Sequence, residues 1–232
     1  MSWGNKKLKA ITFSYDDGAL QDVRLAALFN KYNIKATFNL NSEFLDSKND
    51  SASKPHEKVY REDVKEVYKG HEVAVHTLTH PNLTTLDENE IIRQVEEDRK
   101  SLESLVGYDI VGMAYPCGGV NNDDRVAKII KENTKIRYSR TITLTDSFDA
   151  QSNLYRFNPT AFHLAEDDSL MQKGKEFIEL KPDKPQIFYI WGHSYELDQK
   201  EGNWEKLEEF LKLMSNRDDI FYGTNKEILL GI

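Results

Sequence analysis

Two histidines at the end of a buried-strand pattern restrict this sequence more than any other feature. Residues 72–81 read Glu-Val-Ala-Val-His-Thr-Leu-Thr-His-Pro. The apolar run 73–75 predicts a strand within a sheet, the change to polar residues at His76 marks its end, and Pro81 stops the pattern. A neutral imidazole is the commonest protein ligand for zinc-like metals. His76 and His80 can therefore reach one ion, if the fold brings a further ligand to the same place.

A second strand end, far upstream, offers that ligand. Residues 9–14 predict a first strand, and the sequence continues as Ser14-Tyr15-Asp16-Asp17-Gly18, with two adjacent carboxylates before a glycine. Taken alone, Asp-Asp-Gly is also typical of a turn with an N-cap carboxylate, and two histidines four apart are often solvated or hydrogen-bonded. The local patterns leave both readings open.

The whole chain alternates short apolar runs with amphipathic ones, which is the pattern of βα units. Predicted strands cover residues 9–14, 36–40, 72–76, 110–114, 136–142, 186–191 and, more weakly, 220–222. Predicted helices cover 20–32, 61–69, the stretch from Asp87 to Gly107, 123–133, 169–178, 205–214 and 225–230. Residues 41–57 form a polar loop, and 143–159 have no clear pattern. About six or seven βα units in one domain over residues 1–232 favour a closed or partly closed parallel barrel, with a doubly wound open sheet as the alternative.

Polar residues follow several of these strands. The carboxyl ends of parallel strands share one edge, where α/β active sites form. Asp16, Asp17, His76, His80, the Pro-Cys-Gly-Gly turn at 116–119 and His193 would all meet there. His193 is also compatible with a packed core histidine, and the turn with a turn only. Their joint placement makes a metal site the leading interpretation.

Composition excludes several classes of protein. Hydrophobic residues make up 39% and charged residues 30% of the 232 residues, as in ordinary soluble domains, and no apolar run reaches the length of a membrane span. The net charge of -8 argues against a nucleic-acid partner. Cys117 is the only cysteine, so an internal disulfide is impossible. The first residues contain no apolar signal core, so we expect a cytoplasmic protein, or an extracellular or cell-wall one if a signal peptide was removed. The oligomeric state stays open.

The same residues resemble carbohydrate esterase family 4, the NodB-like polysaccharide deacetylases. Ser14-Tyr15-Asp16-Asp17-Gly18 is similar to the family's Thr-Phe-Asp-Asp-Gly motif, and Gly70-His71-Glu72 with His76-Thr77-Leu78-Thr79-His80 is similar to its second. Pro116-Cys117-Gly118 resembles the end of the third motif, and Ile190-Trp191-Gly192-His193 the last one. The order is that of the family, and the motifs span most of the chain.

The resemblance implies a distorted (β/α)7 barrel and a division of roles. Asp17, His76 and His80 would hold a divalent metal, most suitably Zn²⁺, with Co²⁺, Ni²⁺ or Mn²⁺ as alternatives. Asp16 would be the catalytic base and His193 the general acid. The backbone N–H of Cys117 would stabilise the oxyanion, while Tyr115 and Trp191 are candidates for the acetyl pocket or a sugar face, or for ordinary aromatic packing. The expected substrate is an N-acetylated glycan.

One position departs from the family. The third motif normally begins with an arginine that orients the catalytic aspartate, and here that residue is Ala114. Arg140 and Arg156 are possible substitutes. Asp146 and Asp198 are candidates for the carboxylate that supports the acid. The expectation is therefore a metal-dependent deacetylase of glycans containing N-acetylglucosamine; the alternatives are a hydrolase of a small non-sugar amide on this fold and a catalytically silent carbohydrate-binding protein.

Overall fold

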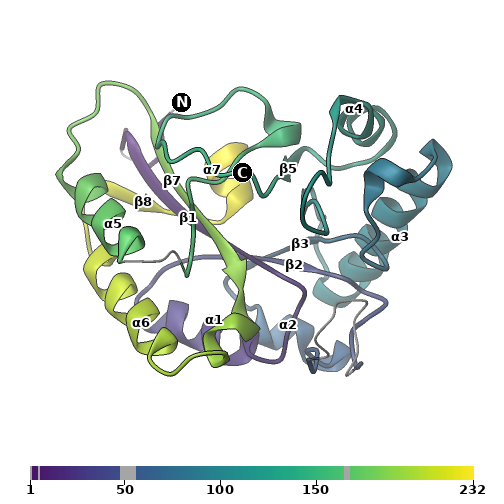
Figure 1. Ribbon diagram of the computed structural model, residues 1–232, viewed down its shortest axis with the longest axis horizontal. Helices are drawn as coiled ribbons and strands as arrows, with labels where there is room; N and C mark the ends of the chain where they lie inside the picture. Colours follow the sequence, from purple (N-terminus) through teal and green to yellow (C-terminus); the bar gives the residue numbers. More distant parts are fainter. Residues whose placement is uncertain (1, 5, 48–55, 165–167) are drawn as a thin grey trace.

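The computed structural model describes residues 2–4, 6–47, 56–164 and 168–232 (Figure 1). Part of the predicted polar loop, residues 48–55, lies outside the described residues. The strands are β1 (Lys9–Asp16), β2 (Thr37–Leu40), β3 (Glu72–Val75), β4 (Gly112–Ala114), β5 (Tyr138–Arg140), β6 (Ala161–Phe162), β7 (Gln186–His193) and β8 (Ile220–Tyr222). The α-helices are α1 (Asp22–Lys31), α2 (Val64–Val67), α3 (Glu88–Val106), α4 (Asp124–Asn133), α5 (Ser169–Glu179), α6 (Asn203–Met214) and α7 (Asn225–Leu229). Short 3-10 helices are η1 (Arg61–Asp63), η2 (Leu83–Thr85), η3 (Leu154–Arg156) and η4 (Ser194–Asp198).

The described strands form one parallel sheet in the order β5-β4-β3-β2-β1-β7-β6, and β8 also pairs with β1. The central strand β1 pairs with β7 along its whole length, from Lys9 opposite Gln186 to Asp16 opposite His193. On its other side β1 pairs with β8 near its start and with β2 near its end. The residues that follow β1, β2, β3, β4, β5 and β7 therefore lie along one edge of the sheet.

Residues 157–162 connect the two edges of the sheet, β5 at one edge and β7 near the other. Arg140 of β5 forms a parallel bridge with Phe157, and the carbonyl of Phe157 accepts a hydrogen bond of 2.9 Å from the Thr141 N–H. The same segment continues into β6, which pairs with β7. The curled sheet is thus a distorted barrel, which confirms the predicted fold class and excludes the open sheet. The sequence pattern did not show β6, because a two-residue strand is too short to display a period.

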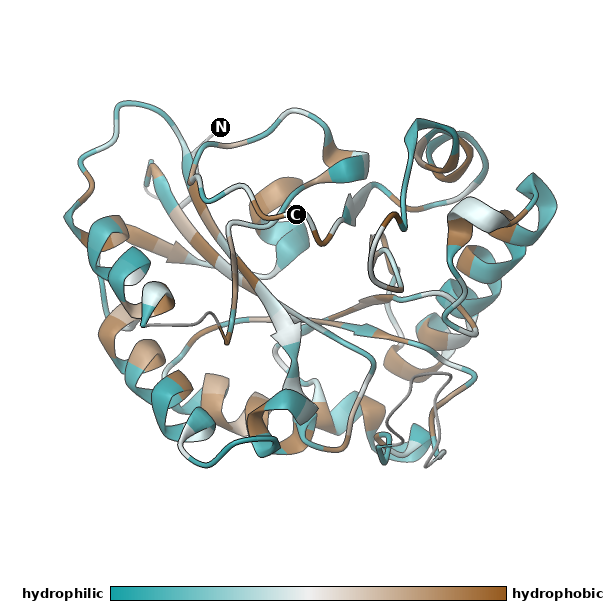
Figure 2. Ribbon diagram, in the orientation of Figure 1, coloured by the Kyte–Doolittle hydropathy of each residue, from teal (hydrophilic) through white to brown (hydrophobic). Residues whose placement is uncertain are grey.

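Helices α1 to α6 pack around the outside of the strands (Figure 1), with apolar faces turned inward (Figure 2). Helix α7 lies within the curve of the sheet, where Asn225 bonds Thr12 of β1 and Thr37 of β2. Helix α3 follows its predicted pattern: Ile91, Val95 and Leu102 are fully buried, Asp87 caps its first turn by accepting from the Glu90 N–H, and Gly107 ends it at φ 79°. Each buried aliphatic side chain of this kind stabilises the fold by about 1.5–3 kcal/mol. None of the described helices combines the length and apolarity needed to cross a membrane.

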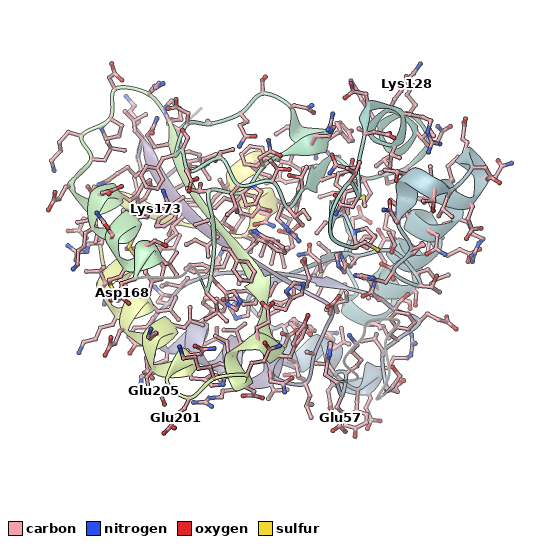
Figure 3. The ribbon with its side chains drawn as sticks, viewed as in Figure 1. Glu57, Lys128, Asp168, Lys173, Glu201 and Glu205 are labelled. Atoms are coloured by element: carbon pink, nitrogen blue, oxygen red, sulfur yellow. The ribbon has the colours of Figure 1, made fainter. Side chains whose placement is uncertain are left out.

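The outer faces of the helices carry charged side chains. Lys128, Glu201 and Glu205, all exposed, lie at the periphery of the molecule (Figure 3). Charged side chains are rarely buried unless they are paired, and Asp16, Asp17 and Arg140, at the carboxyl edge of the sheet, are among those that are buried here.

Candidate active site

Three side chains at the carboxyl edge form a cluster of metal-ligand type. One ligand atom from each of Asp17, His76 and His80 lies within 4.8 Å of the other two. The Nε2 atoms of His76 and His80 are each 3.5 Å from Oδ1 of Asp17. Two ligands about 2.0–2.1 Å from a tetrahedral zinc ion lie roughly 3.3 Å apart, so this spacing fits such an ion. The structure thus brings together the three residues that the sequence assigned to a metal.

The orientation of His76 suits a ligand. Its Nδ1 donates to the carbonyl of Ala114 at 3.0 Å, which directs the Nε2 lone pair at Asp17. Burial lowers the pKa of His76 to about 4, although the charge of Asp16 opposes this, so the imidazole is neutral at pH 7. A metal-ligating histidine commonly donates its other ring N–H to a carbonyl, which fixes the tautomer.

The pKa of Asp17 also suits a ligand. Burial alone would raise this pKa, but the imidazole of His193 and the ammonium of Lys58 hold it well below its ordinary value. The Lys58 side chain is buried and its Nζ donates to the Asp17 carbonyl at 3.0 Å. Asp17 is therefore a carboxylate at neutral pH. Lys58 could not be identified from the sequence, because it follows a polar stretch without periodicity.

The backbone at the cluster is strained. Four non-glycine residues here have left-handed φ values: Asp17 at 80°, Thr77 at 70°, His80 at 57° and Cys117 at 69°. Each such residue costs on the order of 1–3 kcal/mol, and strain of this kind concentrates at functional sites. The strained turns are therefore held in place by contacts elsewhere in the fold.

Buried amides and a buried carboxylate supply those contacts. Nδ2 of Asn41 donates to the carbonyls of His76 and Thr77 at 2.6 and 2.8 Å. Asp98 of α3 accepts from the His76 N–H at 3.2 Å. On the opposite turn, Nδ2 of Asn121 donates to the Cys117 carbonyl at 2.7 Å. Both turns are thus fixed by side chains that the sequence analysis did not single out.

Asp16 lies beside the cluster and is paired with an arginine. Nη2 of Arg140 contacts Oδ1 and Oδ2 of Asp16 at 2.6 and 2.5 Å, and Nδ2 of Asn39 donates to Oδ1 at 2.8 Å. Arg140 stands opposite Ala114 in the register of β4 and β5. The arginine that the family pattern places at 114 is thus replaced by one on the next strand. Arg156 lies elsewhere, bonded to Asn122 and Asp124.

His193 lies on the other side of Asp17, with its Nε2 4.0 Å from Oδ2. Its Nδ1 is 3.1 Å from Oε2 of Glu196. Burial would lower the pKa of His193, but the contact with Glu196 and the charges of Asp17 and Asp16 raise it to about 9. Burial likewise opposes the ionisation of Glu196, yet its histidine partners lower its pKa to about 2.

Glu196 was not among the predicted site residues. The carboxylates suggested for this place lie elsewhere: Asp146 pairs with Lys173, and Asp198 accepts from the side chains of Gln21 and Trp204. Glu196 comes only three residues after His193, and the single turn of η4 carries its side chain back to the histidine. The carboxylate three residues after His193 was the feature of the sequence that could have identified Glu196 as the partner of this histidine.

The residues suggested for substrate contact differ in whether they face the site. Tyr115 is 1% exposed and its hydroxyl donates to the Tyr155 carbonyl at 2.7 Å, so it packs in the core and does not line a pocket. Trp191 is partly exposed beside the site, with the guanidinium of Arg140 4.7 Å from its ring centre. Sγ of Cys117 is 3.8 Å from Nδ1 of His80, and burial raises the pKa of this thiol, which disfavours a nucleophilic thiolate.

Together these features define a parallel α/β barrel with a candidate metal centre at the carboxyl ends of its strands. The family model for polysaccharide deacetylases matches residues 4–135, more than half of the chain. The chain therefore belongs to the polysaccharide deacetylase family, a family of hydrolases, as its motifs predicted.

Individual relatives agree with this assignment. Over 119 residues the chain is 29% identical to a bifunctional xylanase/deacetylase of Pseudobutyrivibrio xylanivorans, covering 51% of this chain and 18% of the relative. It is 30% identical, also over 119 residues, to the peptidoglycan-N-acetylglucosamine deacetylase PgdA of Listeria monocytogenes, covering 50% and 23%. The chain thus spans about a fifth of the length of these relatives. A Mycobacterium smegmatis protein assigned to the polysaccharide deacetylases has the same fold: TM-score 0.69 and 16% identity, covering 100% of this chain and 92% of that one.

Proposed function

We propose that this chain is a metal-dependent deacetylase that hydrolyses the N-acetyl group of poly- or oligosaccharides containing N-acetylglucosamine. One observation carries the proposal: two ionisable groups flank the Asp17–His76–His80 cluster, and each has its own charged partner. Asp16 is paired with Arg140, and His193 with Glu196. A base and an acid on either side of one centre are what amide hydrolysis requires.

Three ligands leave coordination positions open. A zinc ion held by Asp17, His76 and His80 would polarise the acetyl carbonyl and lower the pKa of a water molecule. Other divalent ions that accept carboxylate and imidazole, such as Co²⁺, Ni²⁺ or Mn²⁺, suit the same donors.

The chain's own residues then move the protons. Asp16 takes the proton of the attacking water, and the bonds from Arg140 and Asn39 keep its carboxylate in one orientation while it does so. His193 donates a proton from Nε2 to the amine nitrogen as the C–N bond breaks, since an unprotonated amine is a poor leaving group. The Cys117 N–H is proposed to bind the oxyanion, and the Trp191 ring to contact the acetyl group or the sugar face.

The structure bears differently on the two alternative functions, a silent carbohydrate-binding protein and a hydrolase of a small amide. The silent carbohydrate-binding protein was suggested by the missing arginine at Ala114, and the Arg140–Asp16 pair supplies a guanidinium at the same level of the sheet. This argues for activity. A small non-sugar amide would use the same base and acid, so it remains a second substrate class for the assay to separate.

Acetate release tests the proposal. The substrates are N-acetylglucosamine oligosaccharides, peptidoglycan fragments, acetylated xylan and a set of small acyl amides and ureides. Each is offered to chelated protein and to protein reloaded with zinc or cobalt. Release from the amino sugars that returns only with metal supports the proposal. Release from the small amides alone favours the second substrate class. No acetate release from any substrate, with metal bound, contradicts both the deacetylase and the small-amide hydrolase.

The D16N variant tests the assigned base. We expect its kcat to fall by about a hundredfold or more with its metal content unchanged, because general-base catalysis typically contributes 10²–10⁴-fold. D124N is the matched control, since Asp124 is also paired with an arginine, Arg156, but at the surface. Unchanged turnover in D16N would remove Asp16 from the mechanism.

A further inference from the structure

A second buried histidine stands behind His193 and shares its carboxylate partner. Nε2 of His163 lies 2.9 Å from Oε2 of Glu196, the same oxygen that is 3.1 Å from Nδ1 of His193. The His163 side chain is fully buried, and its Nδ1 is 3.1 Å from the hydroxyl of Tyr15. His163 follows β6, the strand that the sequence pattern missed, so the sequence analysis gave it no role.

The neighbouring strand leaves room for this ring. A Cβ atom added to Gly192 of β7 would lie 2.0 Å from Cδ2 of His163, which no real contact allows. The backbone of Gly192 is extended, so the position does not need glycine for its conformation. It needs glycine for space, because the imidazole of His163 lies directly against it. In the Trp191-Gly192-His193 stretch, the glycine thus makes space for the ring of His163, while the histidine lies in the site.

The hydrogen-bond partners fix the tautomer of His163. A carboxylate only accepts hydrogen bonds, so the nitrogen that faces Glu196 carries the proton. Burial lowers the pKa of His163 and keeps its ring neutral, which leaves Nδ1 as an acceptor for the Tyr15 hydroxyl. The ring therefore has one working orientation, anchored at Tyr15 on β1 and donating to Glu196.

We propose that His163 is a positioning residue for the proton donor: it holds the Glu196 carboxylate at the place from which that carboxylate orients His193. The inference rests on the proposed function, in which His193 protonates the leaving amine. The Glu196 side chain is 20% exposed, and its Oε2 accepts from the His163 imidazole at 2.9 Å and from the His193 backbone N–H at 3.0 Å. Without the bond from His163 the backbone bond is left, and that bond alone does not fix the angle of the carboxylate toward Nδ1 of His193. Removing a hydrogen-bonded partner that orients a metal-ligating histidine typically costs 10–100-fold in activity, and we expect a loss of similar size where the oriented histidine is the proton donor.

Two amide variants separate the contacts of His163. In H163Q the side-chain nitrogen reaches the position of Nε2 and keeps a donor for Glu196. In H163N the shorter side chain keeps a polar group near Tyr15 and withdraws from Glu196. Both are polar and no larger than histidine, so the pair differs chiefly in the contact that the proposal concerns.

The leaving group provides the readout. An N-acetylglucosamine oligosaccharide releases an amine that must be protonated, whereas 4-nitrophenyl acetate releases a phenolate that leaves unaided. We expect H163N to lower kcat on the oligosaccharide by about 10–100-fold with little change in KM. On 4-nitrophenyl acetate it should stay within about twofold of the wild type, and H163Q should recover most of the lost activity. H71N is the matched control, since His71 is also buried but lies at the start of β3, where it accepts from the Ala36 N–H.

Several outcomes would overturn the inference. Equal losses on the amide and the ester in H163N would indicate general damage to the site, and no loss on either would show that Glu196 needs no support. An H163Q variant as slow as H163N would also contradict it. If wild-type protein with metal bound cleaves the ester but no N-acetylated sugar, the proposed function fails and the inference falls with it.

Discussion

Moving one arginine between neighbouring strands tests how this site departs from its family. Ala114 on β4 and Arg140 on β5 are opposite each other in register, and the guanidinium from 140 reaches Asp16 through contacts of 2.6 and 2.5 Å. We expect R140A to lose stability and activity together. The A114R/R140A variant, which returns the guanidinium to β4 and vacates the space on β5, should recover a substantial part of both.

The size of the first effect follows from burial. The side chains of Arg140 and Asp16 are 0% and 2% exposed, and removing one partner of such a pair costs about 3–5 kcal/mol because the remaining charge is left in the interior. The bond from Asn39 to Asp16 survives, which places the expected loss toward the lower end. An unoriented base should also lower kcat by about 10²–10³-fold.

Urea unfolding of metal-free protein measures the stability, and acetate release from zinc-loaded protein measures kcat. The D16N/R140A variant is the control, since it removes the orphaned charge and should regain part of the lost free energy. An R140A protein within about 1 kcal/mol of the wild type would refute the reasoning from burial. An A114R/R140A protein no better than R140A would refute the equivalence of the two positions.

Two further predictions concern metal and pH. At a zinc concentration of about 100 times its Kd, binding should add about 2.7 kcal/mol to the free energy of unfolding and raise Tm by roughly 5–10 °C in calorimetry. Chelator should reverse this gain, and H80A should not show it; a gain that H80A keeps would place the ion elsewhere. Burial raises the pKa of Asp22 to about 7, so its contribution to stability, present below about pH 4, is lost as the pH rises through 7. D22N should therefore gain about 2–3 kcal/mol relative to the wild type between pH 5 and pH 8 in urea unfolding of metal-free protein, and a difference independent of pH would contradict the assignment.

The proximity of Asp17, His76 and His80 could be predicted because the ends of strands are recognisable in the sequence. Apolar residues alternate with polar ones before Asp17 and run unbroken before His76, so both stretches predict strands, and parallel topology brings the ends of such strands to one edge whatever their exact order. The caps of α3 at Asp87 and Gly107 were predictable for a similar reason, since both act through the backbone next to them. Local chemistry and a simple topological rule were sufficient for these residues.

The partners of Asp16 and His193 required three-dimensional information. Arg140 and Arg156 both lie in weakly patterned stretches, and only the register of β4 with β5 shows that Arg140 reaches Asp16. Glu196 depends on the turn of η4, and His163 on a strand of two residues. The contacts of Arg140 and His163 join segments whose pairing no periodicity in the sequence reports, whereas the contact of Glu196 depends on the path of a single turn.

The two supports of the proposed mechanism show why a missing motif residue is a weak sign of lost function in a barrel. At the carboxyl edge, side chains from neighbouring strands point toward a common centre, so a charge can arrive at one point from more than one strand. Arg140 does this for Asp16 from β5, and Glu196 does it for His193 from the turn after β7. In the proposed mechanism the base needs a guanidinium beside it and the acid needs a carboxylate, whichever strand supplies them. A substitution such as Ala114 therefore implies inactivity only where no neighbour at the same level of the sheet supplies the charge, and here the register of Ala114 with Arg140 shows that one does.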